Sequence, residues 1–104
     1  MTLEEKLQYM KVMLDDKTDT NDSEYKVYLD LAKQRLLTHI YPFDQTKVEI
    51  PQRYDMQHIE LAVAIYVKKG AEGESSHDEN GVRRTYKTEG EILAHIPTTA
   101  GFPS

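Results

Sequence analysis

An all-α fold, a small bundle of three to four helices, is predicted for this chain of 104 residues. Apolar residues recur at one-turn spacing in three long segments, which is the helical period. A threonine followed three residues later by a glutamate, the pattern of a capping box, precedes two of the expected helices. The length fits one domain covering residues 1–104, with a core of modest size.

The first helix is expected over about residues 2–15. Thr2 and Glu5 have the spacing of a capping box, in which each side chain accepts a hydrogen bond from the other residue's backbone N–H. The residues that follow form an apolar face at helical spacing: Leu3, Leu7, Met10 and Leu14.

The second helix is expected over about residues 22–39. A polar link precedes it and offers Asn21 or Asp22 as the N-cap. Its apolar face consists of Tyr25, Leu29, Ala32, Leu36 and Ile40. Pro42 ends the pattern, because proline cannot continue a helix.

The third helix is expected over about residues 51–69, with Pro51 at its first position. The run Leu61–Val67 is apolar on nearly every side and rich in β-branched residues, so it would also suit a strand. Ala62, Ala64 and the length of the pattern favour a helix. Such a helix must be surrounded, either by its own domain or by a neighbouring subunit.

A loop is expected over residues 70–87, with a turn at Asn80-Gly81 and a short extended piece or strand at residues 82–86. A short helix follows at about residues 89–96, because Thr88 and Glu91 form a second capping box. Pro97 ends this helix and leaves an irregular C-terminal tail at residues 97–104.

The net charge of −5 is unevenly distributed. Residues 1–30 carry four basic and eight acidic side chains, residues 31–70 six and four, and residues 71–104 three and six. A protein that grips nucleic acid needs a basic surface to displace counterions. Both acidic ends should repel phosphate instead, so specific DNA binding is not expected.

The chain contains no cysteine, which excludes disulfides, thiolate metal sites and thiol catalysis. No apolar run approaches the roughly 20 residues of a membrane helix, and the N-terminal residues lack an export signal pattern. The sequence therefore predicts a protein made in a reducing cytoplasm with no membrane partner.

The loop was considered as a calcium site and as a catalytic site. With Gly81 at the sixth position of a calcium loop, the residue that should be a bidentate glutamate is Lys87, so this interpretation fails. Ser76, His77 and Asp78 are the residue types of a catalytic triad, but neighbours in an extended chain point to opposite sides. We expect no catalytic residue here, and the protein is not predicted to be an enzyme.

Metal and cofactor sites are not predicted either. The glycines after the third helix lack the lysine and the preceding strand of a phosphate-binding loop. The histidines show no ligand spacing, and each is interpreted as a surface or half-buried side chain: His39, His58, His77 and His95. The loop does contain glycine, arginine and tyrosine, which suit a protein interface, although a solvated loop without a specific role has the same composition.

Residues Ile59–Tyr86 resemble the phage head–tail connector (adaptor) family, the small helical neck proteins that bind below the portal. The family pattern is an apolar helix ending in tyrosine, a basic pair, G-[AS]-E-G, a serine-rich acidic stretch, then N-G-[IV], a basic, a hydroxyl and an aromatic residue. The matching residues are Tyr66, Lys68, Lys69, Gly70, Ala71, Glu72, Gly73, Ser75, Ser76, Asn80, Gly81, Val82, Arg84, Thr85 and Tyr86.

The resemblance implies a structural virion protein, located at the head–tail junction and assembled in the host cytoplasm. It implies a ring of identical subunits, dodecameric in the virion, below the portal protein and above the next neck or stopper protein. DNA would pass through the lumen of the ring during packaging completion and ejection without specific binding.

Site residues are predicted on this basis. The expected subunit interface consists of Glu72, Gly73, Glu74, Asn80, Gly81, Arg83, Arg84 and Tyr86. The expected contacts with the portal or neck protein are Ile96, Pro97 and Phe102. The alternative function is a small cytoplasmic regulatory or binding module that uses the acidic loop to bind a basic protein partner.

Overall fold

The computed structural model of the chain describes residues 1–44, 46–72 and 87–98. Four α-helices form the fold: α1 (Leu3–Met13), α2 (Asp22–Ile40), α3 (Asp55–Glu72) and α4 (Glu89–Ala94). A single 3₁₀ turn, η1 (Gln52–Tyr54), precedes α3. The described residues contain no strand, so the predicted all-α class is confirmed.

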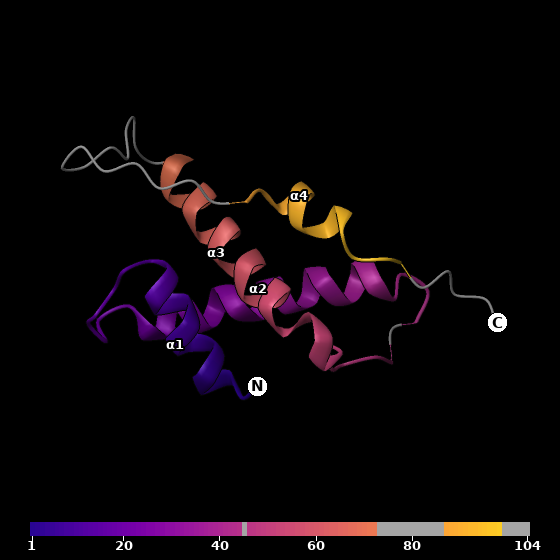
Figure 1. Cartoon of the computed structure of the whole chain (residues 1–104), viewed down its shortest axis with the longest axis horizontal. Helices are drawn as coiled ribbons and strands as arrows, with labels where there is room; N and C mark the ends of the chain where they lie inside the picture. Colours follow the sequence, from indigo (N-terminus) through magenta and orange to yellow (C-terminus); the bar gives the residue numbers. More distant parts are fainter. Residues whose placement is uncertain (45, 73–86, 99–104) are drawn as a thin grey trace.

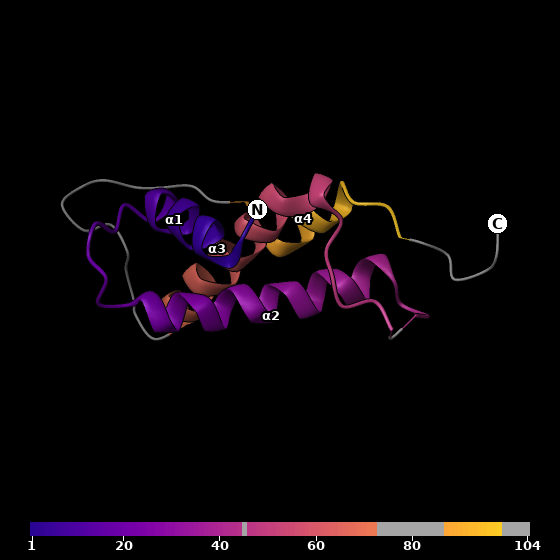
Figure 2. The same cartoon turned by 90° about the horizontal axis from the view of Figure 1, so that it is seen from below.

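The long helix α3 lies at the centre of the bundle. It crosses α2, and α1 and α4 lie on opposite sides of it in both views (Figures 1 and 2). This arrangement explains why α3 is apolar almost all round: Leu61, Ala62 and Val63 are fully buried by helices of the same chain. The apolar surface of α3 is therefore buried by its own domain, without a neighbouring subunit.

The core is continuous through the four helices and joins residues far apart in the sequence. Helix α1 contributes Leu7 and Met10, whereas α4 and the turn after it contribute Ile92 and Ile96. The remaining members come from α2, η1 and α3: Tyr25, Leu29, Ala32, Leu36, Ile40, Tyr54, Ile59, Leu61, Ala62, Val63, Ala64 and Ile65.

Both predicted capping boxes are present. Glu5 N–H donates to the Thr2 hydroxyl (3.2 Å) and Thr2 N–H donates to the Glu5 carboxylate (2.8 Å). Thr88 and Glu91 form the same pair of bonds at the start of α4. These short-range signals place the beginnings of α1 and α4 at the predicted residues.

Helix α1 ends two residues before the predicted boundary at residue 15. Asp15 has φ 58°, the left-handed conformation that terminates helices. Its N–H donates to the Val12 carbonyl (3.1 Å) and the Asp16 N–H donates to the Lys11 carbonyl (2.8 Å), which together form a Schellman motif. An aspartate thus occupies the position that glycine usually takes.

Helix α3 begins at Asp55 rather than at the predicted Pro51. Pro51 is extended (φ −53°, ψ 136°), and η1 intervenes because the Tyr54 N–H donates to the Pro51 carbonyl. Helix α4 ends at Ala94 instead of residue 96. His95 and Ile96 form a turn, in which their N–H groups donate to the carbonyls three residues earlier. The strand expected at residues 82–86 lies outside the described residues, as does most of the tail.

Three tyrosines close the side of the bundle where α2 begins and α3 ends. The Tyr66 ring makes edge-to-face contacts with Tyr25 (centroids 5.2 Å apart) and Tyr28 (5.3 Å). The Tyr25 hydroxyl donates to the Asp16 carboxylate (2.6 Å). We call these three rings and Asp16 the tyrosine cluster.

Candidate functional site

The predicted interface segment leaves the bundle at the end of α3. Glu72 is the last residue of that helix. The other interface residues, Gly73, Glu74, Asn80, Gly81, Arg83, Arg84 and Tyr86, lie outside the described residues. Their role in a subunit interface therefore stays a prediction.

The chain is described again from Lys87, whose ammonium lies 3.3 Å from the Glu60 carboxylate on α3. Glu60 and Glu72 are separated by about 18 Å along the helix, at 1.5 Å per residue. The described residues on the two sides of this segment, Glu72 and Lys87, are therefore both connected to α3, the first as its last residue and the second through Glu60.

The predicted docking residues behave differently from one another. Ile96 is only 3% exposed, because its side chain is part of the bundle's own core, and its carbonyl accepts a hydrogen bond from His39 Nε2 (2.8 Å). Pro97 is exposed, and Phe102 lies outside the described residues. The surface available to a partner near this point thus begins at Pro97, and the docking role stays a prediction.

Polar contacts attach α4 and the turn after it to α2. Arg35 on α2 forms an ion pair with Glu89 in the first turn of α4. The bond from His39 to the Ile96 carbonyl fixes the other end of the short helix. The position from which the tail leaves the bundle is therefore set by α2 and α3.

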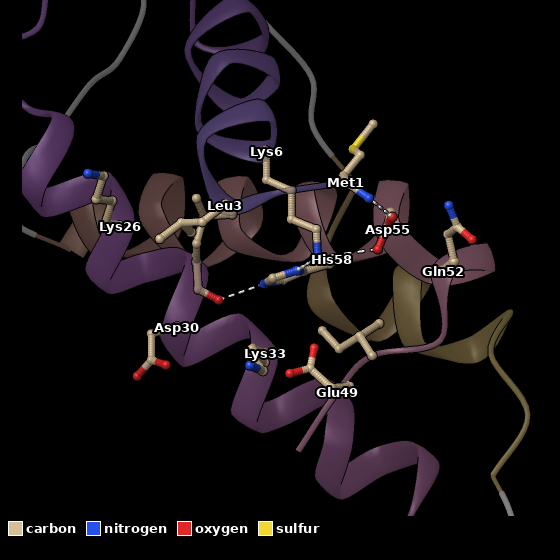
Figure 3. A pocket seen from close by; sticks show the side chains of 12 residues that line it. Met1, Leu3, Lys6, Lys26, Asp30, Lys33, Glu49, Gln52, Asp55 and His58 are labelled. Atoms are coloured by element: carbon tan, nitrogen blue, oxygen red, sulfur yellow. Dashed lines mark hydrogen bonds and ion pairs between the residues drawn. The ribbon is translucent and has the colours of Figure 1, made fainter. Parts of the chain in front are cut away.

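A pocket of about 500 Å³ opens between α1, α2 and the segment before α3 (Figure 3). Leu29 and His58 are buried residues of its wall, and Lys6 and Asp55 join them. The other lining residues are Met1, Leu3, Lys26, Asp30, Lys33, Glu49, Ile50 and Gln52.

A buried polar network lies against this pocket and joins three helices. The Lys6 ammonium of α1 donates to His58 Nδ1 (2.8 Å) and lies 3.2 Å from the Asp55 carboxylate. Nε2 of His58 lies 2.7 Å from the Leu29 carbonyl of α2. The Met1 amino group completes the network at 2.9 Å from Asp55. We call Lys6, Asp55 and His58 the α1 anchor.

The electrostatics of the α1 anchor follow from this geometry. Burial lowers the pKa of His58, the nearby Lys6 lowers it further, and the bond to Leu29 opposes the change only in part. Burial alone would raise the pKa of Asp55, but hydrogen bonds from the Met1 amino group and Lys6 hold that pKa below its usual value. The favoured state therefore has neutral His58, ionised Asp55 and ammonium Lys6.

The sequence interpretation of His58 as a surface or half-buried side chain was wrong, since the residue is 3% exposed. Its position on α3 beside the fully buried Ile59 was the available signal for burial. Its partner could not be identified from the sequence, because Lys6 is 52 residues away. His39 is half-buried and His95 is exposed, as expected, and His77 lies outside the described residues.

In the described residues, the polar side chains around the pocket make contacts that hold helices together. No group of three or more potential metal-ligating side chains occurs in residues 1–44, 46–72 and 87–98. In the same part of the chain, every helix is too short or too polar to cross a bilayer. The pocket and the α1 anchor hold helices together, and no side chain there has the setting of an activated nucleophile.

The fold and these sites define a class: a small helical domain whose four described helices share one core. A family model for the phage gp6-like head-tail connector protein matches residues 4–96, from the start of α1 to the buried isoleucine after α4. The chain therefore belongs to this family, and it is a structural protein of the phage neck, a component of the virion at the head–tail junction. Neither the curated proteins nor the solved structures searched gave a match.

Proposed function

We propose that the protein assembles into a ring below the portal, through which DNA passes during completion of packaging and during ejection. The observation that carries this proposal is the extent of the family match. Residues 4–96 cover the loop and the four described helices apart from Leu3, which supports a connector domain that comprises the whole bundle.

In this proposal, residues 70–87 form the contact with the next subunit. A head-to-tail contact closes into a ring when the rotation between neighbours allows it. Arg83 and Arg84 pair with acidic side chains across the boundary, and Glu72 and Glu74 supply such charges. Tyr86 packs as the apolar anchor of the contact, because tyrosine and arginine are enriched at interface centres.

Three further residues of the loop shape this contact, and the C-terminal tail makes a second contact. Gly73 and the turn at Asn80-Gly81 give the loop the backbone freedom to reach a neighbour. The tail, beginning beside Ile96 with exposed Pro97 and including Phe102, docks onto the portal or the next neck protein. The ring is dodecameric in the virion.

The proposed ring lets DNA pass without specific binding. The net charge of −5 disfavours the counterion release that drives phosphate binding. The protein has no catalytic role and needs no cofactor in this account. Its partners are copies of itself, the portal protein and the next neck protein.

The proposal is tested by Arg84→Glu, with Lys17→Glu as the matched control. Lys17 is an exposed lysine on the link between α1 and α2, far in sequence from the loop, so its reversal changes the net charge equally. The attachment of each folded variant to purified portal-bearing capsids is measured by co-sedimentation.

We expect Arg84→Glu to keep the helical circular dichroism spectrum and lose attachment, whereas Lys17→Glu keeps both. Unchanged attachment of Arg84→Glu would contradict the interface role of the loop. Failure of the unaltered protein to attach, with a defined complex formed with a host protein instead, would favour the regulatory alternative.

A further inference from the structure

We propose that the α1 anchor is a proton-operated release for one end of α1: when His58 takes up a proton, the first turn of the helix, Leu3–Lys6, separates from α2 and α3. The proposal concerns the bundle itself and does not depend on the connector function. It rests on the hydrogen-bond partners of both ring nitrogens and on the charges around them.

Only one form of His58 satisfies both of its neighbours. The Leu29 carbonyl can only accept a hydrogen bond, so Nε2 carries the hydrogen in the 2.7 Å contact. Nδ1 must then be without hydrogen, because the Lys6 ammonium, 2.8 Å away, can only donate. A proton on Nδ1 would replace this hydrogen bond by two facing donors with the same charge.

The other charged groups near the ring do not relieve that conflict. On α3, Asp55 is the nearest carboxylate, but it already binds Lys6 (3.2 Å) and the Met1 amino group (2.9 Å). On α2, Lys33 adds a further positive charge that disfavours the protonated ring. The charge of Asp55 raises the pKa of His58, but it offsets the lowering by burial and by Lys6 and Lys33 only in part. The carboxylates of Asp30 and Glu49 also line the pocket.

The Lys6 side chain borders open space into which its ammonium can move. The pocket of about 500 Å³ is lined by Lys6, Asp55 and His58 themselves, so the ammonium can leave His58 without displacing a packed side chain. Figure 3 shows the Lys6 side chain descending from α1 to the ring, with the labelled pocket residues around it. Lys6 is the residue of the first turn whose side chain contacts His58 and Asp55, so loss of these contacts weakens the attachment of this turn to α3. The ion pair between Glu4 of the same turn and Lys26 of α2 (3.2 Å) is exposed to solvent and contributes little to holding it.

The opposite end of α1 has no comparable release. There Lys11 forms an ion pair with Asp22 (2.9 Å), and Met10 is completely buried. Helix α1 is therefore expected to open from its N-terminal end only, while its C-terminal half stays attached to the core.

The sign of the pH dependence follows from linkage. Because the folded-state pKa of His58 lies below its ordinary value of 6.5, the attached state has its full stability above that value and loses it as the pH falls toward the folded pKa. Between the two values, the released fraction grows by about tenfold per pH unit, the slope for uptake of one proton.

Amide hydrogen exchange of the full chain, followed by NMR between about pH 7.5 and about pH 5, tests the proposal. Protection is corrected for the intrinsic exchange rate at each pH. The amides of Lys6, Leu7 and Gln8, which bond to the first turn, should lose protection by about tenfold per pH unit at the steepest point. The amides of residues 10–13 and of Ile59–Val63 should stay protected. A uniform loss over all helices, or none in α1, would overturn the proposal.

Two variants separate charge from structure. Lys6→Gln keeps a hydrogen-bond donor for Nδ1 but removes the ammonium, so the pKa of His58, read from its ring NMR signals, should rise toward the ordinary value and the response of α1 should shrink. His39→Asn is the matched control, since His39 bonds the Ile96 carbonyl on the other side of the bundle. A His58 pKa unchanged by Lys6→Gln, or an α1 response lost in His39→Asn, would contradict the proposal.

Discussion

The two ends of α3 are joined to neighbouring helices by different kinds of interaction. At its beginning, the α1 anchor joins three helices through buried charges, with His58 and Asp55 both less than a tenth exposed. Toward its other end, the tyrosine cluster joins α2 and α3 through edge-to-face rings, and its carboxylate, Asp16, lies at the margin. In our proposal the first closure weakens when His58 is protonated, below its ordinary pKa of 6.5, whereas the second contains no histidine.

The difference teaches where this bundle can change and where it cannot. Helix α3 ends at Glu72, six residues after Tyr66, so the tyrosine cluster lies toward the end of α3 from which the predicted interface segment follows. The α1 anchor, by contrast, responds to a proton at the far end of the same helix. A contact surface on the loop would therefore keep its support over a pH range in which the start of α1 does not.

The largest effect is expected at the α1 anchor, from Asp55→Ala. The variant leaves the buried Lys6 ammonium without the carboxylate that it shares with the Met1 amino group, which costs about 3 kcal/mol of unfolding free energy. Urea unfolding at neutral pH measures the loss. Asp30→Ala, at an exposed residue of the same pocket, is the control, with a change within about 0.5 kcal/mol. Equal effects of the two variants would mean that the network adds nothing.

The next effect is expected in the tyrosine cluster, from Tyr66→Leu. The substitution keeps an apolar side chain but removes both edge-to-face contacts, which together contribute about 2 kcal/mol. Tyr9→Leu on the exposed face of α1 should change stability by no more than about 0.5 kcal/mol. If the two variants have the same thermal unfolding midpoint, the edge-to-face contacts add no stability beyond the burial of apolar surface.

A smaller and pH-dependent effect is expected from Tyr25→Phe. The hydrogen bond from Tyr25, followed by those from Thr18, lowers the pKa of Asp16 to about 2. Because this folded-state value is depressed, the stabilisation is present above the ordinary value of 3.8 and is lost as the pH falls toward 2. The unaltered protein should thus lose more stability between these two values than the variant does. Urea midpoints at both pH values measure this, and parallel losses would argue against the bond.

The smallest effect is expected from Lys87→Gln. Its ion pair with Glu60 joins the end of the loop to α3, but the lysine side chain is 59% exposed and solvent screens the charge. We expect a change in unfolding free energy below about 0.5 kcal/mol, measured by urea unfolding. A much larger loss would mean that Lys87 fixes the loop rather than only touching α3.

The sequence predicted the features that depend on neighbouring residues. In each capping box the threonine and the glutamate are three residues apart, and the two boxes correctly located the starts of α1 and α4. The start of α3 was misplaced because the 3₁₀ turn before it depends on burial of Tyr54, which is a tertiary contact. The end of α1 was misplaced because Asp15, rather than a glycine, takes the left-handed conformation.

The site was harder to predict for the same reason. The α1 anchor joins Lys6 to His58 and Leu29, and no local pattern reports a contact across 52 residues. Ile96, in contrast, could have been assigned to the core, since it lies one turn after Ile92 on the same face. Periodicity predicts what a helix buries, whereas polar partners from other helices must be seen in the fold.

Cryo-electron microscopy can show whether copies of this chain form a ring at the portal. Portal-bearing capsids without tails, from the phage that encodes the protein, are incubated with the purified chain and imaged. The account predicts a closed ring of helical bundles directly below the portal, with residues 73–86 of each copy against its neighbour. Capsids that bind no protein, or that carry single copies without contacts between them, would contradict it.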